Sequence, residues 1–257
     1  PSLPSANRQR LHEVLRANQE CKGAEACWKA QHLTGLISHH VDLEERPRTV
    51  TAPVIRGVSA APMTPVAVSS QKIRVKIMPL GDSITFGWPD RGYGGYQHLL
   101  GTLLANDGYM IDFVGSRRNG NEGQPGWTIA QIRNGIDSNG WLETYQPDII
   151  LLHIGTNDIR QGHADSAAGN LSALLDDILT RLPKVYVIVA QIIPFRRGSD
   201  PDHRSYNAAI PGIVASKGPR VSMVDMENIL SKDDYADGLH PNPGGYDKMA
   251  RAWEPAI

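Results

Sequence analysis

The stretch that decides the fold is residues 73–85, which read IRVKIMPLGDSIT. Its first part, Ile73–Leu80, predicts a β-strand in which Arg74 and Lys76 alternate with apolar residues before an apolar second half. Gly81 then permits a tight turn that presents Ser83 directly after the strand. Ligands of open α/β sheets bind at the carboxyl ends of the strands, so Ser83 occupies a position suited to a nucleophile. The alternative is an ordinary serine that caps the next helix through its hydroxyl.

Outward from this stretch, apolar runs alternate with amphipathic segments to the end of the chain, as is typical of a parallel sheet covered by helices. We expect strands at Ile73–Leu80, Met110–Val114, Asp148–Ile154, Val185–Ile193 and Val221–Val224. We expect helices at Tyr96–Asn106, Ile129–Asn134, Ser166–Leu182, Arg204–Ala215 and Gly244–Trp253. No Gly-x-Gly-x-x-Gly sequence follows a strand, so a dinucleotide site is not indicated. The pattern predicts one α/β domain over residues 72–257.

Residues 1–71 are expected to form an N-terminal extension and linker. The first 40 residues carry two weak helical patterns, and residues 41–71 are rich in Pro, Ser, Thr, Ala and Val. Cys21 and Cys27 are the only cysteines; they fit no four-ligand zinc motif and leave a disulfide or two free thiols open. The start of the chain shows no signal peptide, as would also hold for a processed product.

Charge and hydropathy narrow the class of partner. The 257 residues carry a formal net charge of -1, from 26 basic and 27 acidic side chains. Such a chain has no global field that would attract nucleic acid or an anionic membrane. Its apolar runs are also shorter than the roughly 20 residues that cross a bilayer. A neutral or polymeric substrate fits better, with neither nucleic acid nor membrane as partner, and the oligomeric state is left open.

A second motif lies near the end of the chain, where Asp237 and His240 stand three residues apart in the run DGLHP. A serine nucleophile needs a base, and histidine can take the hydroxyl proton near neutral pH. A carboxylate on the other ring nitrogen fixes the tautomer and stabilises the imidazolium. The alternative is a surface Asp and His in a loop before a final helix. With Ser83, the pair predicts a catalytic triad.

Two further turns follow predicted strands and could stabilise an oxyanion. Gly115 follows the strand at Met110–Val114, and Asn157 follows the strand at Asp148–Ile154. Acyl transfer develops negative charge on a carbonyl oxygen, which preorganised N–H donors stabilise. The Asn157 side chain and the backbone N–H groups of Ser83 and Gly115 are the candidate donors. Taken alone, Gly115 and Asn157 are explained as ordinary turn residues. Taken in order with Ser83, Asp237 and His240, they predict an ester hydrolase.

These blocks resemble the SGNH (GDSL-like) hydrolase superfamily. The matching residues are Gly81–Thr85, Gly115, Gly155–Asp158 and Asp237–His240. The resemblance implies a three-layer α/β/α, flavodoxin-like fold with a five-stranded parallel sheet. It also implies functional roles for Ser83, Gly115, Asn157 and His240.

A narrower resemblance is to the acetylxylan esterases of carbohydrate esterase family three. It is carried by Met78–Thr85, Gly94–Tyr96, Asp112–Ser116, Glu122–Gly123 and Gly126–Thr128. Position 124 departs from the pattern, because it is Gln where many relatives have His. The resemblance covers Lys72 to the carboxyl end and implies removal of acetyl groups from plant cell-wall polysaccharide such as xylan, outside the cell.

Several other side chains are assigned from their context. Trp127 is a candidate substrate contact, because aromatic faces pack on sugars, or else a core indole. Asp82 is the second candidate contact, although Asp82 and Asp158 are also expected to bond local backbone amides in their turns. His153 is expected in the core. The remaining histidines show no metal-ligand spacing, so we expect neither a metal nor another cofactor.

Three functions remain open from the sequence. The first is the polysaccharide deacetylase, and the second is an esterase, thioesterase or lysophospholipase-like enzyme acting on lipids or small esters. A long acyl chain needs an extended apolar groove, whereas an acetyl group needs a small pocket. The third is a carbohydrate-binding protein that has lost catalysis.

Overall fold

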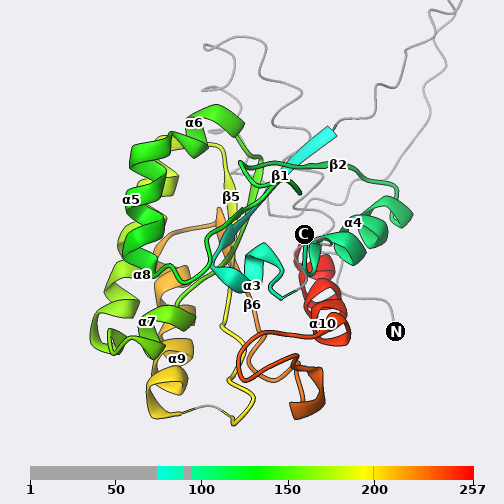
Figure 1. Ribbon diagram of the computed structural model, residues 1–257. Coiled ribbons are helices and arrows are strands. Elements are labelled where there is room, and N and C mark those ends of the chain that lie inside the picture. The colour runs from blue at the N-terminus through cyan, green and yellow to red at the C-terminus, as the bar shows by residue number, and fades with distance from the viewer. Residues whose placement is uncertain (1–73, 90–93, 199) are drawn as a thin grey trace, which may run out of the picture. The chain divides into compact units, whose positions relative to one another are not determined.

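Five parallel strands form the centre of the fold, in the order β2-β1-β4-β5-β6 (Figure 1). Their bounds are β1 Arg74–Gly81, β2 Met110–Phe113, β4 Ile149–His153, β5 Tyr186–Ala190 and β6 Val221–Val224. The five strands expected from the sequence are therefore confirmed. A short sixth strand, β3 (Glu122–Gly123), pairs with the end of β1. It was not predicted, because two residues carry no periodicity.

The structure is a computed structural model that describes residues 74–89, 94–198 and 200–257. The helical patterns expected in the first 40 residues and the linker of residues 41–71 lie outside these ranges. Within them, no helix is both long enough and apolar enough to span a membrane.

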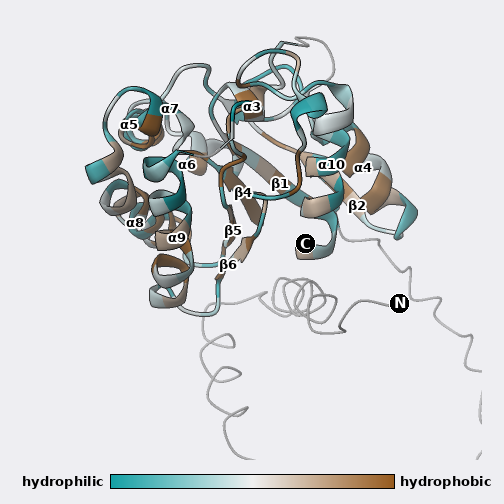
Figure 2. Ribbon diagram, turned by 90° about the horizontal axis from the view of Figure 1, so that it is seen from below, coloured by the Kyte–Doolittle hydropathy of each residue, from teal (hydrophilic) through white to brown (hydrophobic). Residues whose placement is uncertain are grey.

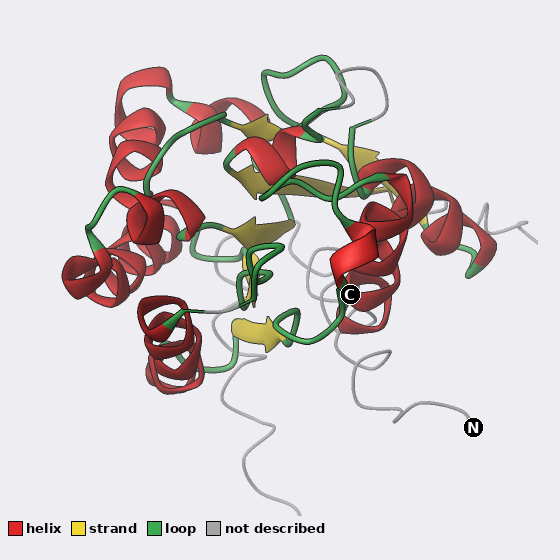
Figure 3. Cartoon of the chain, turned by 60° about the horizontal axis from the view of Figure 1, so that its bottom comes forward, coloured by secondary structure: helices red, strands yellow, loops and turns green. Residues whose placement is uncertain are grey.

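Helices cover both faces of the sheet. Figures 1 and 3 show α4 and α10 on one face and α5, α8 and α9 on the other. The longer helices are α4 Gln97–Asn106, α5 Ile129–Asn139, α8 Ala164–Arg181, α9 Pro201–Ser216 and α10 Pro243–Trp253. The shorter ones are α3 Ser83–Phe86, α6 Trp141–Tyr145, α7 Thr156–Arg160 and the 3₁₀ turns η1 Lys232–Asp234 and η2 Glu254–Ala256. The expected three-layer α/β/α architecture is confirmed.

Helix α5 continues past its expected end at Asn134. A glycine usually weakens a helix, which is why the pattern predicted a stop before Gly135. In the structure Gly135 faces the rings of Trp127 and Trp141, and a β-carbon there would lie 2.7 Å from each. The helix instead ends at Gly140, whose left-handed conformation caps it. Gly135 is thus a packing residue and not a helix terminator.

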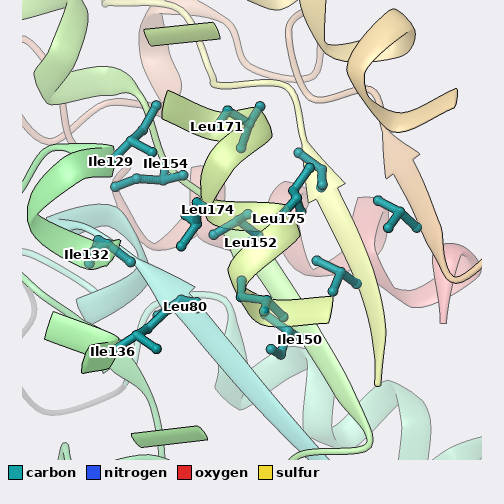
Figure 4. Packing of buried hydrophobic residues seen from close by; sticks show 14 of the residues in the cluster. Leu80, Ile129, Ile132, Ile136, Ile150, Leu152, Ile154, Leu171, Leu174 and Leu175 are labelled. Atoms are coloured by element: carbon teal, nitrogen blue, oxygen red, sulfur yellow. The ribbon is translucent and has the colours of Figure 1, made fainter. Parts of the chain in front are cut away.

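The alternation of side chains along the strands divides the core into two layers. Leu80 on β1 and Leu152 on β4 point toward α5 and α8, where they pack with residues such as Ile132 and Leu174 (Figure 4). Their neighbours, including Leu151, are equally buried and point to the opposite face. Figure 2 shows these apolar strands enclosed between the two helical layers. Burial on both faces explains why the central strands β4 and β5 read as continuous apolar runs, whereas β1 begins with the exposed Arg74 and Lys76.

The first prediction concerns this core. Replacing the fully buried Ile132 by alanine should lower the free energy of unfolding by about 2–5 kcal/mol, because it leaves a cavity between α5 and the sheet. Asn134→Ala, on the exposed face of the same helix, should change it by about 0.5 kcal/mol or less. Urea unfolding of both variants measures the difference. Equal, small effects would mean that α5 does not pack as described.

Candidate active site

Ser83 is the first residue of α3, which begins directly after β1. Asp82 caps this helix, because its Oδ1 accepts the Ile84 N–H at 2.9 Å. A β-carbon on Gly81 would lie 2.1 Å from the carbonyl oxygen of His153, so only glycine fits where β1 passes β4. The close approach of the two strands thus fixes where the turn begins. It places the Ser83 hydroxyl at the carboxyl edge of the sheet.

Ser83, His240 and Asp237 form one continuous chain of hydrogen bonds. Ser83 Oγ lies 2.9 Å from His240 Nε2, and His240 Nδ1 lies 2.8 Å from Asp237 Oδ2. The other carboxylate oxygen, Oδ1, accepts the backbone N–H groups of Leu239 and His240 at 2.6 and 2.7 Å. The three side chains predicted from two distant motifs therefore lie together. Both the position and the ring orientation of His240 are fixed by Asp237.

The charge of Asp237 suits this arrangement. Partial burial acts to raise its pKa, but the hydrogen bonds from the His240 ring and from the His240 and Leu239 backbone outweigh it and hold the pKa below the usual value. Asp237 is consequently ionised at neutral pH. An anionic partner on Nδ1 leaves Nε2 to accept a proton from Ser83.

Short backbone contacts hold the loop that carries His240. The Ala236 N–H donates to the His240 carbonyl at 2.9 Å, and the Asn242 N–H donates to the Asp234 carbonyl at 2.8 Å. The Trp88 ring lies 6.3 Å from the His240 ring, centroid to centroid. Trp88 could not be predicted as part of the site, because nothing in the sequence shows that its ring meets a histidine about 150 positions further along the chain.

Asn157 lies on α7, just beyond the end of β4. Its Nδ2 donates to the carbonyl oxygen of Trp127 at 3.0 Å and is 3.4 Å from Asp82 Oδ2. The preceding Gly155 has a φ of 124°, and a β-carbon there would lie 2.5 Å from the Tyr206 ring. The amide is therefore held beside the residue that precedes Ser83. This agrees with the expectation that both belong to one crevice.

Gly115 follows β2 on the other side of β1. Its φ is 152°, and a β-carbon would lie 2.4 Å from the backbone of Asn121, so a larger residue does not fit. Neither the Gly115 N–H nor the Ser83 N–H donates a hydrogen bond to another described residue. Because β2, β1 and β4 are adjacent, the residues that follow them meet at one edge of the sheet. Two backbone donors and one side-chain amide are available there.

A buried carboxyl group organises the segment after Gly115. Glu122 has no exposed surface and accepts the Ser116 N–H, the Ser116 hydroxyl at 2.9 Å and the Gln124 amide at 3.1 Å. Burial raises the pKa of Glu122, while these hydrogen bonds act in the opposite direction. Arg117 donates to Gln124 and to the Gly123 carbonyl. From the sequence, Gln124 stood out only as a departure from the family pattern. The network itself was not predicted, because its members carry no shared spacing.

Asp82 and Asp158 both make the local backbone interactions expected of turn residues. The side chain of Asp82 is fully buried, its bond to the local Ile84 amide is confirmed, and its contact with substrate stays a prediction. Burial raises the pKa of Asp82 to about 7. Asp158 accepts the N–H of Ile129, 29 residues away, which the sequence did not predict. It thereby ties the start of α5 to α7. Burial raises the pKa of Asp158, and its own backbone amide acts to lower it, as expected of a turn residue.

Trp127 and His153 occupy the kinds of position expected for them. The ring of Trp127 is half-buried, lies 6.1 Å from the Trp141 ring and borders a cavity of about 460 Å³ shared with Gln124. Its contact with substrate stays a prediction. His153 is a core residue, as expected, and burial lowers its pKa to about 4. Its Nε2 accepts the Ile193 N–H at 3.4 Å.

Among the described residues, no three His, Asp or Glu side chains lie close enough together to hold a metal ion.

Comparison with known proteins agrees with this geometry. The model of the GDSL-like lipase/acylhydrolase family matches residues 80–248. The chain belongs to this family. The matched range contains Ser83, Gly115, Asn157, Asp237 and His240. Membership in the GDSL-like family supports a hydrolase that acts on esters.

Similar proteins place this GDSL-like chain near carbohydrate esterases. It is 35% identical over 235 residues to a multidomain esterase of Ruminococcus flavefaciens, covering 77% of this chain but only 30% of that protein. It resembles the structure of a family 3 carbohydrate esterase of Clostridium thermocellum, with 40% identity, a TM-score of 0.62, and 70% and 94% of the two chains covered. It also resembles an acetyl esterase solved with an acetate ion, with 30% identity and a TM-score of 0.60. That match covers 70% of this chain and 95% of the acetyl esterase.

The second prediction follows from the burial of Asp82. Its pKa in the folded protein, about 7, is above the ordinary 3.8, so the folded state binds more protons than the unfolded state between these values. The contribution of Asp82 to stability is therefore lost as pH rises through this window. Asp82→Asn keeps a helix-capping oxygen but cannot ionise. The stability of the variant relative to the parent should grow from pH 4 to 7, by up to about 1.4 kcal/mol per pH unit.

Urea unfolding at several pH values measures this difference. The new amide faces Asn157 at every pH and can add a constant to the difference in stability between variant and parent, so the test is the change of that difference with pH. A difference that is the same at pH 4 and at pH 7 would contradict the raised pKa of Asp82.

Proposed function

We propose that the protein is a serine esterase that removes acetyl groups from acetylated plant cell-wall polysaccharide such as xylan. The observation that carries the proposal is the unbroken hydrogen-bond chain from Ser83 through His240 to Asp237. It lies at the edge of the sheet where open α/β folds bind ligands. Such a chain activates a hydroxyl that is otherwise a poor nucleophile at neutral pH.

The reaction proceeds in two acyl-transfer steps. As Ser83 Oγ attacks the acetyl carbonyl carbon, His240 Nε2 takes the hydroxyl proton, and Asp237 stabilises the imidazolium through Nδ1. The tetrahedral intermediate collapses when His240 returns the proton to the departing sugar oxygen, which leaves an acetyl-Ser83 ester. Water then attacks this ester with His240 as base, and acetate leaves as Ser83 recovers its proton. No oxidant or cofactor is needed to balance these steps.

Three donors stabilise the oxyanion in each step: the backbone N–H groups of Ser83 and Gly115 and the side-chain amide of Asn157. The two backbone groups have no partner among the described residues, so they need not break a hydrogen bond to receive the oxygen. Asn157 is oriented by its bond to the Trp127 carbonyl. Its longer contact, 3.4 Å to Asp82, is the one that a substrate oxygen would displace. Donors fixed before the charge develops lower the barrier most.

The choice of an acetylated polysaccharide rests on the relatives and on Trp127. Two of the similar solved structures are a family 3 carbohydrate esterase and an acetyl esterase. The half-buried ring of Trp127 borders a cavity beside Gln124, where an aromatic face can pack on a sugar. Action on such a polymer also implies that the protein works outside the cell.

The test of substrate class is acetate release from acetylated xylan, compared with aryl esters of increasing acyl length. If the protein is a deacetylase, kcat/KM should fall steeply for acyl chains longer than acetyl, because a small pocket excludes longer chains. Rates that rise toward long chains would favour a lipid esterase. No turnover of any ester, with retained binding to xylan, would favour a carbohydrate-binding protein.

The third prediction is that Ser83→Ala lowers ester hydrolysis by about 10⁴-fold or more, because it removes the nucleophile. The variant should keep its melting temperature within a few degrees, since the hydroxyl contributes little packing. Ser138→Ala, an exposed serine on α5, serves as control and should retain full activity. If Ser83→Ala keeps a tenth of the parent activity, Ser83 is not the nucleophile.

The fourth prediction separates catalysis from turn formation at Asn157. As an oxyanion donor, Asn157→Ala should lower kcat by about 10²- to 10³-fold with a smaller effect on KM. As a turn residue only, it would lower the melting temperature while each folded molecule kept near-normal kcat. Active-site titration and a melting curve on one preparation distinguish the two. Normal kcat per titrated site would leave only the two backbone donors.

A further inference from the structure

A cavity of about 760 Å³ opens beside His240. The residues that line it follow β4, β5 and β6, whereas Trp127 follows β3, which pairs with β1. The cavity lies between the end of α7, the segment after β5 and the loop of residues 237–240. Its walls include Arg160, Phe195, Arg197, Asp200, Leu239 and His240. Its volume is in the range of about 300–1,000 Å³ typical of ligand sites. Of the residues that line it, the proposed deacetylation uses only Asp237 and His240.

Two guanidinium groups, those of Arg160 and Arg197, line this cavity. Arg160 is the last residue of α7, three positions after Asn157, and Arg197 lies in the turn Phe195–Gly198. Neither side chain forms a hydrogen bond or ion pair with another described residue. Elsewhere in the fold, Arg133 and Arg181 are paired with carboxylates. The charge of Arg160 also acts on the buried Asp82, whose pKa burial raises and this charge lowers. The N–H groups of both cavity arginines nevertheless have no hydrogen-bond partner among the described residues and can donate to an anion.

The carboxylates that share the cavity are already engaged. Asp237 is bonded to His240 and to two backbone N–H groups. Asp200 caps α9, where its Oδ1 accepts the His203 N–H at 2.8 Å. Both still carry negative charge, so the cavity would repel a dianion more than a monoanion. A single carboxylate on the ligand fits this balance better than a phosphate.

The turn that carries Arg197 is held in place before any ligand binds. The Arg196 N–H donates to the Gly238 carbonyl at 3.1 Å, which joins the turn to the loop of Asp237 and His240. The Gly198 N–H donates to the Phe195 carbonyl at 2.7 Å and closes the turn. Beneath it, the fully buried His203 lies 5.9 Å from the Phe195 ring. A backbone ordered in advance loses less entropy on binding.

We propose that Arg160 and Arg197 form a subsite for the carboxylate of a uronic-acid unit next to the acetylated sugar. The inference rests on the proposed function and narrows its substrate to acidic acetylated polysaccharide. A guanidinium matches a carboxylate through two parallel N–H···O bonds, which supplies orientation as well as affinity. With the carboxylate bound there, the acetyl ester of the neighbouring sugar is brought to Ser83.

The fifth prediction compares two acetylated oligosaccharides that differ only in one group: a uronic-acid carboxyl, or the same carboxyl reduced to an alcohol. The parent enzyme should show a higher kcat/KM on the acidic oligosaccharide, and the preference should shrink as salt is added. Arg160→Gln and Arg197→Gln should each lower kcat/KM on the acidic substrate about tenfold. Activity on the neutral oligosaccharide and on an aryl acetate should stay within about twofold. Arg251→Gln, an exposed position on α10, removes the same charge at a distance and should change neither.

Two results would overturn the subsite. One is a parent enzyme with no preference for the acidic substrate, and the other is an equal loss on both substrates in the arginine variants. Competition identifies the anion: glucuronate should inhibit more strongly than inorganic phosphate, and the reverse order would reassign the subsite to phosphate groups.

Failure of the proposed function can be told apart from failure of the subsite. An absence of esterase activity on every ester would reject the function alone. The subsite would then be tested by calorimetric binding of a deacetylated oligosaccharide that contains a uronic acid. Binding that the Arg160→Gln/Arg197→Gln double variant loses would support the subsite, and binding that it retains would reject it.

Discussion

The hydrogen bond between Ser83 Oγ and His240 Nε2 is the constraint that the active site depends on and that the surrounding structure must satisfy. It joins residues 157 positions apart at a distance of 2.9 Å. A hydrogen bond weakens steeply when its atoms separate, so both partners must be held from independent directions. β1 and the cap by Asp82 hold Ser83, while Asp237 and the neighbouring backbone hold His240. The parallel sheet supplies the fixed frame between the two segments.

Precise positioning at this edge is obtained by burying polar groups. Asp82, Glu122 and Asn157 are each at least nine-tenths buried, and burial raises the pKa of both carboxyl groups. Such burial is unfavourable by itself and is offset by hydrogen bonds to backbone N–H groups and amides. Each of these bonds also fixes a turn that follows a strand. Polar burial and site geometry are therefore two consequences of one arrangement.

The regular elements could be predicted because their signals are local. All five main strands follow from apolar runs, and the five longer helices follow from amphipathic segments between them. The end of α5 was placed too early, because local propensity at Gly135 is overridden by contact with two tryptophan rings. The two-residue β3 and the five-residue α6 and α7 are too short for any period to be visible. Packing, and not propensity, sets these elements.

The sequence by itself determined the class of fold and the order of the reactive groups, because Ser83, Asn157 and His240 each stand at a fixed step after a recognisable strand or in a recognisable motif. Only the tertiary structure decided what surrounds them. It placed Asp82 beneath the site and set Arg160 and Arg197 into one cavity. The physical reason is that burial and through-space proximity depend on how layers pack, and residues from separate loops carry no common spacing along the chain.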